Sequence, residues 1–140
     1  MHSFELHPQL NADYHPIGWL NNCRVLLHHN AGVPWYILVP ATGAGELHEM
    51  GSAERSELEQ ALDTMAGFIK HHHGSERVNI GAIGNRVPQL HVHVIGRHQH
   101  DPCWPDAVWG HLPPGPEWDA ATLATIRREA PISDNSPHRE

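Results

Sequence analysis

The chain has little cysteine and no long hydrophobic run. Its two cysteines, Cys23 and Cys103, lie far apart and form no Cys-x-x-Cys pattern. Neither a disulfide framework nor a zinc ribbon is indicated, which fits a reducing cytoplasm. No apolar run approaches the roughly 20 residues that span a bilayer, and residues 1–10 lack the basic-then-apolar order of a signal peptide. We therefore expect a soluble, cytoplasmic protein with no membrane partner.

Basic residues are also scarce. Lys and Arg number 9 against 16 Asp and Glu, which gives a formal net charge of −7 when histidine is neutral. General affinity for nucleic acid needs a basic surface to meet the phosphates, so we expect no nucleic-acid partner. A single nucleotide needs only a few local donors, and the charge balance does not exclude such a ligand.

The length of 140 residues suits one domain with one core. We expect a single domain over residues 1–140, with its core at about 20–112 and a flexible tail over 131–140. Runs rich in branched apolar residues predict strands, which lie at 23–28, 35–39, 78–83 and 90–95. With a long helix between them, these strands predict the α+β class: an antiparallel sheet with the helix packed on one face.

The long helix is predicted from Ser52, where apolar residues begin to recur at spacings of three and four. Its apolar stripe consists of Leu58, Ala61, Leu62, Met65, Phe68 and Ile69. Ser52 can cap its start and Gly74 can end it in the left-handed conformation. A short helix and turn are expected over 1–20, an ordered irregular segment over 98–116 and a final helix over 117–129.

Histidine is abundant, with 15 residues, and two clusters have metal-ligand side chains. His71, His72 and His73 lie at the predicted helix end, where cationic side chains suit the helix dipole, so a solvated helix end is favoured over a metal site. The second cluster consists of His98, His100, Asp101 and Cys103. Zinc is conceivable there, but the irregular spacing and nearby prolines favour a loop. No metal site is predicted.

The segment 87–97 contains the most informative pattern. Side chains alternate across a strand, so Gln89, His91 and His93 are expected to share one face while Leu90, Val92 and Val94 share the other. In a histidine-rich chain such a pair can arise by chance on a solvated face. Burying polar groups on a core strand, however, costs free energy unless they form hydrogen bonds or take part in function.

Residues 89–95, Gln-Leu-His-Val-His-Val-Ile, resemble the His-φ-His-φ-His-φ-φ signature of the histidine triad (HIT) superfamily, where φ is apolar. One residue departs, because Gln89 stands at the first histidine. The resemblance covers about residues 20–100. Outside the signature, it is carried by the segments 33–40, 79–81 and 84–87. The chain is also similar to a bacterial branch of this superfamily, in which glutamine replaces that histidine and a stretch like residues 101–110 follows the signature.

The resemblance implies that His91 attacks an α-phosphate and forms a covalent nucleotidyl-imidazole. His93 would donate a hydrogen bond to the phosphate and, as imidazolium, neutralise developing charge. Gln89 would orient the phosphate or leaving group but cannot transfer a proton near neutral pH. The resemblance also places Asn79, Asn85 and Arg86 beside the phosphate and Asn30 near the ribose.

The resemblance thus implies a nucleotide hydrolase or nucleotidyl transferase that acts on a purine nucleotide conjugate, such as a dinucleoside polyphosphate or phosphoramidate, with no obligatory cofactor. It also implies a homodimer, which the two tryptophans in 104–110 favour because aromatics suit interfaces. Two other interpretations stay open. The first is a nucleotide-binding module made catalytically weak by Gln89, and the second is a histidine-rich metal-binding protein.

Overall fold

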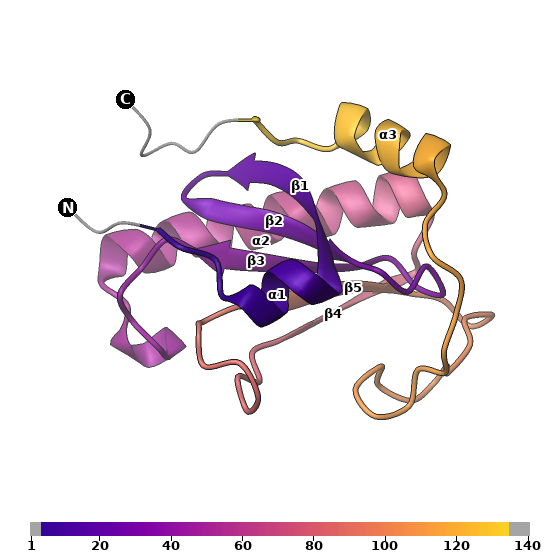
Figure 1. The fold of residues 1–140 in the computed structure, drawn as a ribbon, viewed down its shortest axis with the longest axis horizontal. Helices are drawn as coiled ribbons and strands as arrows, with labels where there is room; N and C mark the ends of the chain where they lie inside the picture. Colours follow the sequence, from indigo (N-terminus) through magenta and orange to yellow (C-terminus); the bar gives the residue numbers. More distant parts are fainter. Residues whose placement is uncertain (1–3, 135–140) are drawn as a thin grey trace.

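The computed structural model describes residues 4–134 and contains one five-stranded antiparallel sheet (Figure 1). The strand order is β1-β2-β3-β5-β4. The strands are β1 (Tyr14–Leu20), β2 (Cys23–His28), β3 (Trp35–Pro40), β4 (Arg77–Gly81) and β5 (Val92–Arg97). The helices are α1 (Pro8–Asp13), α2 (Ser52–His73), α3 (Ala120–Glu129) and a short 3-10 helix, Leu47–Glu49. The predicted α+β class and sheet are confirmed.

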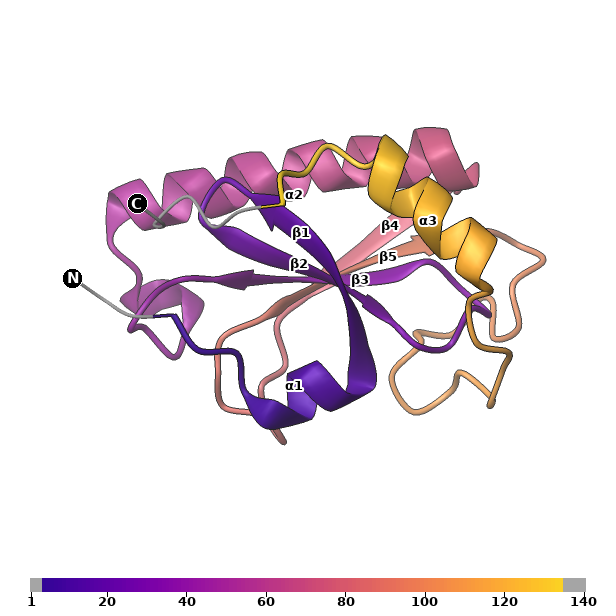
Figure 2. The same ribbon diagram turned by 45° about the horizontal axis from the view of Figure 1, so that its top comes forward.

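Helix α2 lies along one face of the sheet, and α3 lies on the same side (Figure 2). Leu58, Ala61, Met65 and Ile69 of its predicted stripe are buried against β2, β3 and β5. The helix ends at Gly74, which has a φ of 68° and supplies the left-handed conformation. The N-cap is Gly51 rather than Ser52, so the predicted cap was wrong by one position.

The opposite face of the sheet is covered by α1 and by the irregular segment after β5. An ion pair fixes this segment: the Arg97 guanidinium donates to both carboxylate oxygens of Asp101, at 2.7 and 3.1 Å, and both side chains are almost fully buried. Asp101 also accepts from the backbone N–H groups of His98 and Cys103. The predicted order and irregularity of this segment are confirmed.

Strand β1 contradicts the expected turn before residue 20. Pro16 and Gly18 suggest a turn, but they lie at a break in the pairing register of an edge strand, where proline is tolerated. A Cβ on Gly18 would come within 2.6 Å of Ile132, so glycine also permits the close approach of the segment after α3. Ser133 exchanges two backbone hydrogen bonds with Trp19, both 2.8 Å. Within the expected tail, Ser133 is thus paired with Trp19 of β1, and residues 135–140 lie outside the described range.

The helix end at 71–73 is only partly solvated, which corrects the expectation for His73. His71 is exposed, whereas the Nε2 atom of His73 lies 2.7 Å from the Tyr36 hydroxyl. Burial, with the neighbouring His72 charge, lowers the pKa of His73 to about 4. Helix α3 begins at Ala120 behind the N-cap Asp119, close to its predicted start. Within residues 4–134, no helix combines the length and apolar character needed to cross a membrane.

Candidate active site

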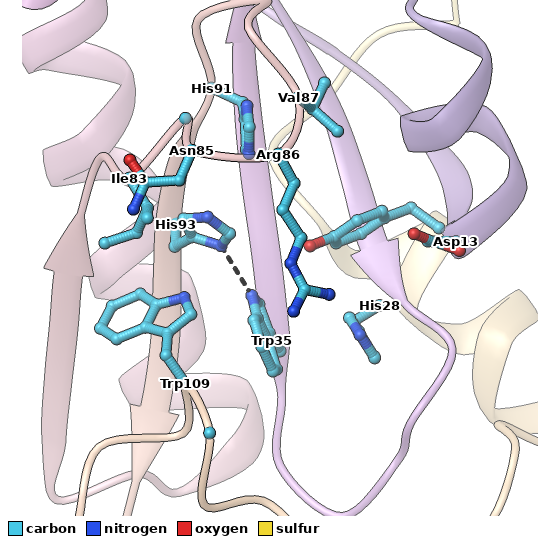
Figure 3. Close-up of a pocket in the computed structure, with 13 residues that line it drawn as sticks. Asp13, His28, Trp35, Ile83, Asn85, Arg86, Val87, His91, His93 and Trp109 are labelled. Carbon is cyan, nitrogen blue, oxygen red and sulfur yellow. Dashed lines mark hydrogen bonds between the residues drawn. The ribbon is translucent and has the colours of Figure 1, made fainter.

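A cavity of about 540 Å³ opens on the face of the sheet opposite α2 (Figure 3). We call it the main pocket. Its lining residues are Asp13, Tyr14, His28, Trp35, Ile83, Gly84, Asn85, Arg86, Val87, His91, His93, Trp109 and Gly110. The volume lies within the range typical of small-molecule sites. The pocket contains both histidines of the 87–97 segment.

His91 lies just before β5 and has one defined hydrogen bond. Its Nδ1 atom is 2.7 Å from the backbone carbonyl oxygen of Gln89. A carbonyl can only accept, so Nδ1 must carry the proton and the neutral ring has its lone pair on Nε2. The side chain is largely buried and lines the pocket wall. His91 is therefore prepared to act as a nitrogen nucleophile.

His93 has the opposite arrangement. The indole Nε1–H of Trp35 donates to its Nδ1 atom at 3.0 Å, drawn as the dashed line in Figure 3. An indole nitrogen can only donate, so Nδ1 is unprotonated and the neutral ring carries its proton on Nε2. Burial, and then the His91 and His28 charges, lower the pKa of His93 to about 3. His93 is a neutral hydrogen-bond donor in the free pocket, and its role as imidazolium during the reaction stays a prediction.

Aromatic rings form one wall of the pocket. Trp35 stacks on His28 with ring centroids 4.4 Å apart, and Tyr14 meets His28 edge to face at 5.1 Å. The backbone N–H of Asn30 donates to His28 Nδ1, which places the His28 proton on Nε2. Sequence reasoning missed His28 and Tyr14 because β1 was not recognised, and their pairing across β1 and β2 brings them together.

Trp109 closes the pocket beside β4. Its ring meets His93 edge to face at 5.3 Å and packs over Gly81, where a Cβ would lie 3.1 Å from the indole. Among the described residues, no hydrogen-bond partner reaches its buried Nε1 atom. A buried donor without a partner costs free energy, so Trp109 offers an N–H that a ligand can satisfy. The segment 101–110 thus supplies a pocket residue.

Asn85 and Arg86 line the pocket where the sequence predicted polar contacts. Both are exposed and lie on the loop before His91, and Arg86 extends toward Trp35 and His28 (Figure 3). A guanidinium offers a fixed fork of donors for a phosphate. These two residues therefore form a polar rim opposite the aromatic wall.

Gln89 is not brought into the main pocket. Its side-chain oxygen accepts from the backbone N–H of His7 at 2.7 Å, and its amide nitrogen donates to the carbonyl oxygen of Glu5 at 3.0 Å. Gln89 lies at a bend three residues before β5, so the alternation that places His91 and His93 on one face does not extend to it. These two hydrogen bonds hold the N-terminal segment beside the main pocket.

Asn79 and Asn30 also lie elsewhere. The Asn79 side-chain oxygen accepts a hydrogen bond from Arg97 at 2.9 Å, and Asn79 does not line the main pocket. Asn30 accepts from the Gly32 backbone and donates to the carbonyl oxygen of Pro113, which fixes the turn after β2. Both side chains have structural hydrogen bonds in the free protein.

His91 also borders a second cavity of about 230 Å³, which we call the side cavity. Its lining residues are Gly45, Glu46, Ala82, Ile83, Gly84, Pro88, Leu90 and His91. The nucleophile candidate therefore lies between two cavities, and only the larger one contains His93.

Comparison with known proteins identifies relatives of the whole domain. A model of the HIT domain matches residues 9–100, a range that starts before β1 and ends just after β5. No curated protein matches the chain.

Solved structures give the same result at higher coverage. A histidine triad protein from Sinorhizobium meliloti is 38% identical, with a TM-score of 0.85 over 90% of this chain and 93% of that one. One from Bradyrhizobium japonicum is 34% identical, with a TM-score of 0.83 over 90% and 97%. One from Marinobacter aquaeolei is 36% identical, with a TM-score of 0.82 over 89% and 91%.

Proposed function

The chain belongs to the histidine triad (HIT) family, and on that premise we propose that it hydrolyses or transfers the nucleotidyl group of a purine nucleotide conjugate. The observation that carries the proposal is the His91 Nδ1–H···O=C bond to Gln89, because it leaves the Nε2 lone pair beside a pocket of nucleotide size. No cofactor takes part in the proposed chemistry.

In the first step, His91 Nε2 attacks the α-phosphorus and the bond to the leaving group breaks with its electron pair. His93 donates its Nε2–H to a phosphoryl oxygen, and Arg86 supplies positive charge at the rim. In the second step, water or an acceptor hydroxyl attacks phosphorus, loses a proton to solvent and displaces His91. The products are a nucleoside monophosphate, or its ester with the acceptor, and free enzyme.

The geometry favours a leaving group that needs no proton. Among the polar groups described here, His93 is neutral with its Nδ1 held by Trp35, and Gln89 is turned toward Glu5 and His7. General acid catalysis is typically worth about 10²–10⁴-fold, and it matters most for basic leaving groups. We therefore place dinucleoside polyphosphates, which release a nucleoside phosphate, ahead of phosphoramidates, which release an amine. The side cavity next to His91 is available for the departing group.

A substrate comparison tests this function. Diadenosine polyphosphate, its guanosine and uridine analogues, and an adenosine phosphoramidate are incubated with wild-type protein and with His91→Ala, with and without a chelator. We expect purine polyphosphates to be cleaved fastest, with no effect of chelation and no turnover by the variant. Binding without turnover of every substrate would instead support the nucleotide-binding module.

We further propose that the protein forms a homodimer through β4. This strand lies at an edge of the sheet, and Ile80 on it is 51% exposed. An open edge with an apolar side chain suits pairing with a second copy. Trp104, from the stretch that the sequence favoured for an interface, is 37% exposed, with the Arg97 guanidinium over its ring at 5.7 Å. Light scattering should give twice the 15.7 kDa chain mass, and Ile80→Lys should shift it toward one chain.

A further inference from the structure

Three potential metal ligands from distant parts of the sequence meet on the surface. His15 lies on β1, His29 follows β2, and Glu117 precedes α3. His15 Nε2 is 2.7 Å from Oε1 of Glu117, and His29 Nδ1 is 2.5 Å from Oε2. One ligand atom from each residue lies within 4.8 Å of the other two. We call this group the His-Glu-His cluster.

The backbone holds the three segments together independently of these side chains. The N–H of Ala31 donates to the carbonyl oxygen of Pro116 at 2.7 Å, and Asn30 forms an isolated bridge with Glu117. The backbone N–H of Trp118 donates to Glu117 Oε1 at 2.9 Å, which orients the carboxylate. The positions of the ligand residues are therefore fixed by the fold, and only their side-chain torsions need to adjust.

The two imidazole rings face the carboxylate side by side. Their centroids are 4.1 Å apart and their planes are tilted by 26°. A carboxylate only accepts, so each ring directs an N–H toward Glu117, and each of these nitrogens gains a lone pair when the proton moves to the other nitrogen of the ring. Two imidazole nitrogens and one carboxylate oxygen form a donor set used for zinc, with a fourth position left for water.

We propose that the His-Glu-His cluster is a Zn²⁺ site. Tetrahedral zinc with bonds of about 2.0–2.1 Å places its ligand atoms about 3.3 Å apart. The His–Glu contacts of 2.5 and 2.7 Å are shorter and all three ligand atoms lie within 4.8 Å of one another, so each separation must change by at most about 1.5 Å, which ordinary side-chain torsions provide. On binding, each neutral ring moves its proton through solvent from the nitrogen that faces Glu117 to its other nitrogen, and the facing nitrogen binds the metal.

The site is separate from the proposed reaction. His28 and His29 are consecutive, but His28 lines the main pocket whereas His29 joins the cluster. Zinc would connect β1, the turn after β2 and the segment before α3 without touching His91 or His93. Its role would be structural, so it would stabilise the folded state by mass action.

Zinc titration of chelator-stripped protein tests the site at about pH 7.5, where most ordinary imidazoles are neutral. The variants are His29→Gln and Glu117→Gln, with His71→Gln as the matched control because His71 is exposed and belongs to the His71–His73 run. We expect one equivalent to bind wild type and the control equally, and each cluster variant at least about tenfold more weakly. Melting curves without metal establish that each variant is folded.

A second measurement needs no variant. Zinc should shift the ring resonances of His15 and His29 in NMR spectra and leave those of His71 in place. The proposal is overturned if wild type binds no zinc, if either cluster variant binds as tightly as wild type, or if His71→Gln loses the site. Ring shifts confined to residues outside the cluster would overturn it as well.

Discussion

Trp35 donates its indole N–H to Nδ1 of His93 at 3.0 Å, inside the main pocket. Because the indole cannot accept, this one contact determines which nitrogen of His93 carries the proton. Nε2–H then faces the space where a phosphate would bind. In the proposed reaction, Trp35 is thus a positioning residue for the His93 donor.

Replacing the indole tests that role. Trp35→Phe keeps an aromatic ring beside His28 and removes the N–H. A hydrogen bond of this kind contributes about 0.5–1.5 kcal/mol, so we expect kcat to fall by up to about tenfold with a smaller change in KM. The ¹⁵N shifts of the His93 ring should report a mixture of tautomers. Unchanged ring shifts with reduced kcat would mean that Trp35 acts in another way.

Gln89 is predicted to be dispensable for chemistry. Gln89→His loses hydrogen bonds to Glu5 and His7, so the free energy of unfolding should fall by about 1–2 kcal/mol. Since the side chain faces the N-terminal segment, we expect turnover to change by less than about threefold for both phosphate-leaving and amine-leaving substrates. A gain of about 10²-fold for the amine alone would show that the new ring reaches the leaving group as an acid.

A buried histidine makes the fold sensitive to acid. His73 has a pKa of about 4 when folded and 6.5 as the reference value, so the unfolded chain binds more protons between these values. Stability is therefore full above about pH 6.5 and declines as the pH falls toward 4. The variant His73→Phe should take up about one proton fewer than wild type on unfolding in this window. Denaturant melts at several pH values measure the difference.

Two glycines predict opposite effects of the same substitution. A Cβ on Gly96 would lie 2.2 Å from Ser75 Oγ and 2.6 Å from Ile69 Cγ2, because α2 packs closely on β5 there. Gly96→Ala should destabilise by about 1–3 kcal/mol. Gly67 lies within α2, and a Cβ there would meet nothing within 4 Å beyond the neighbouring backbone of the helix, so Gly67→Ala should stabilise by about 0.4–1 kcal/mol. Equal unfolding midpoints for the two variants would refute this packing argument.

Local sequence patterns were sufficient to predict the helix and strands that have a single hydrophobic periodicity. The three-and-four spacing predicted α2 to within a residue, and alternation placed His91 and His93 opposite Val92 and Val94. The sheet was predicted except for β1, whose Pro16 and Gly18 are compatible with a strand only because it is an edge with a register break.

The pocket was harder to predict because its walls come from contacts between segments distant in sequence. Asn85 and Arg86 line it as expected, but Gln89 is held by residues 5 and 7, some 80 positions earlier. The Asn79 side chain accepts a hydrogen bond from Arg97, whose buried ion pair with Asp101 was not predicted. Such choices of partner follow from tertiary packing, which residue spacing does not encode.

The central claim is the covalent bond between phosphorus and His91 Nε2. The most direct measurement is mass spectrometry of protein quenched in alkali during turnover of a diadenosine polyphosphate, since a phosphorus–nitrogen bond to imidazole is labile in acid. The account predicts an added adenylyl group on the peptide that contains His91, absent from His91→Ala. Rapid turnover without any adduct, an adduct on another residue, or turnover by His91→Ala would contradict it.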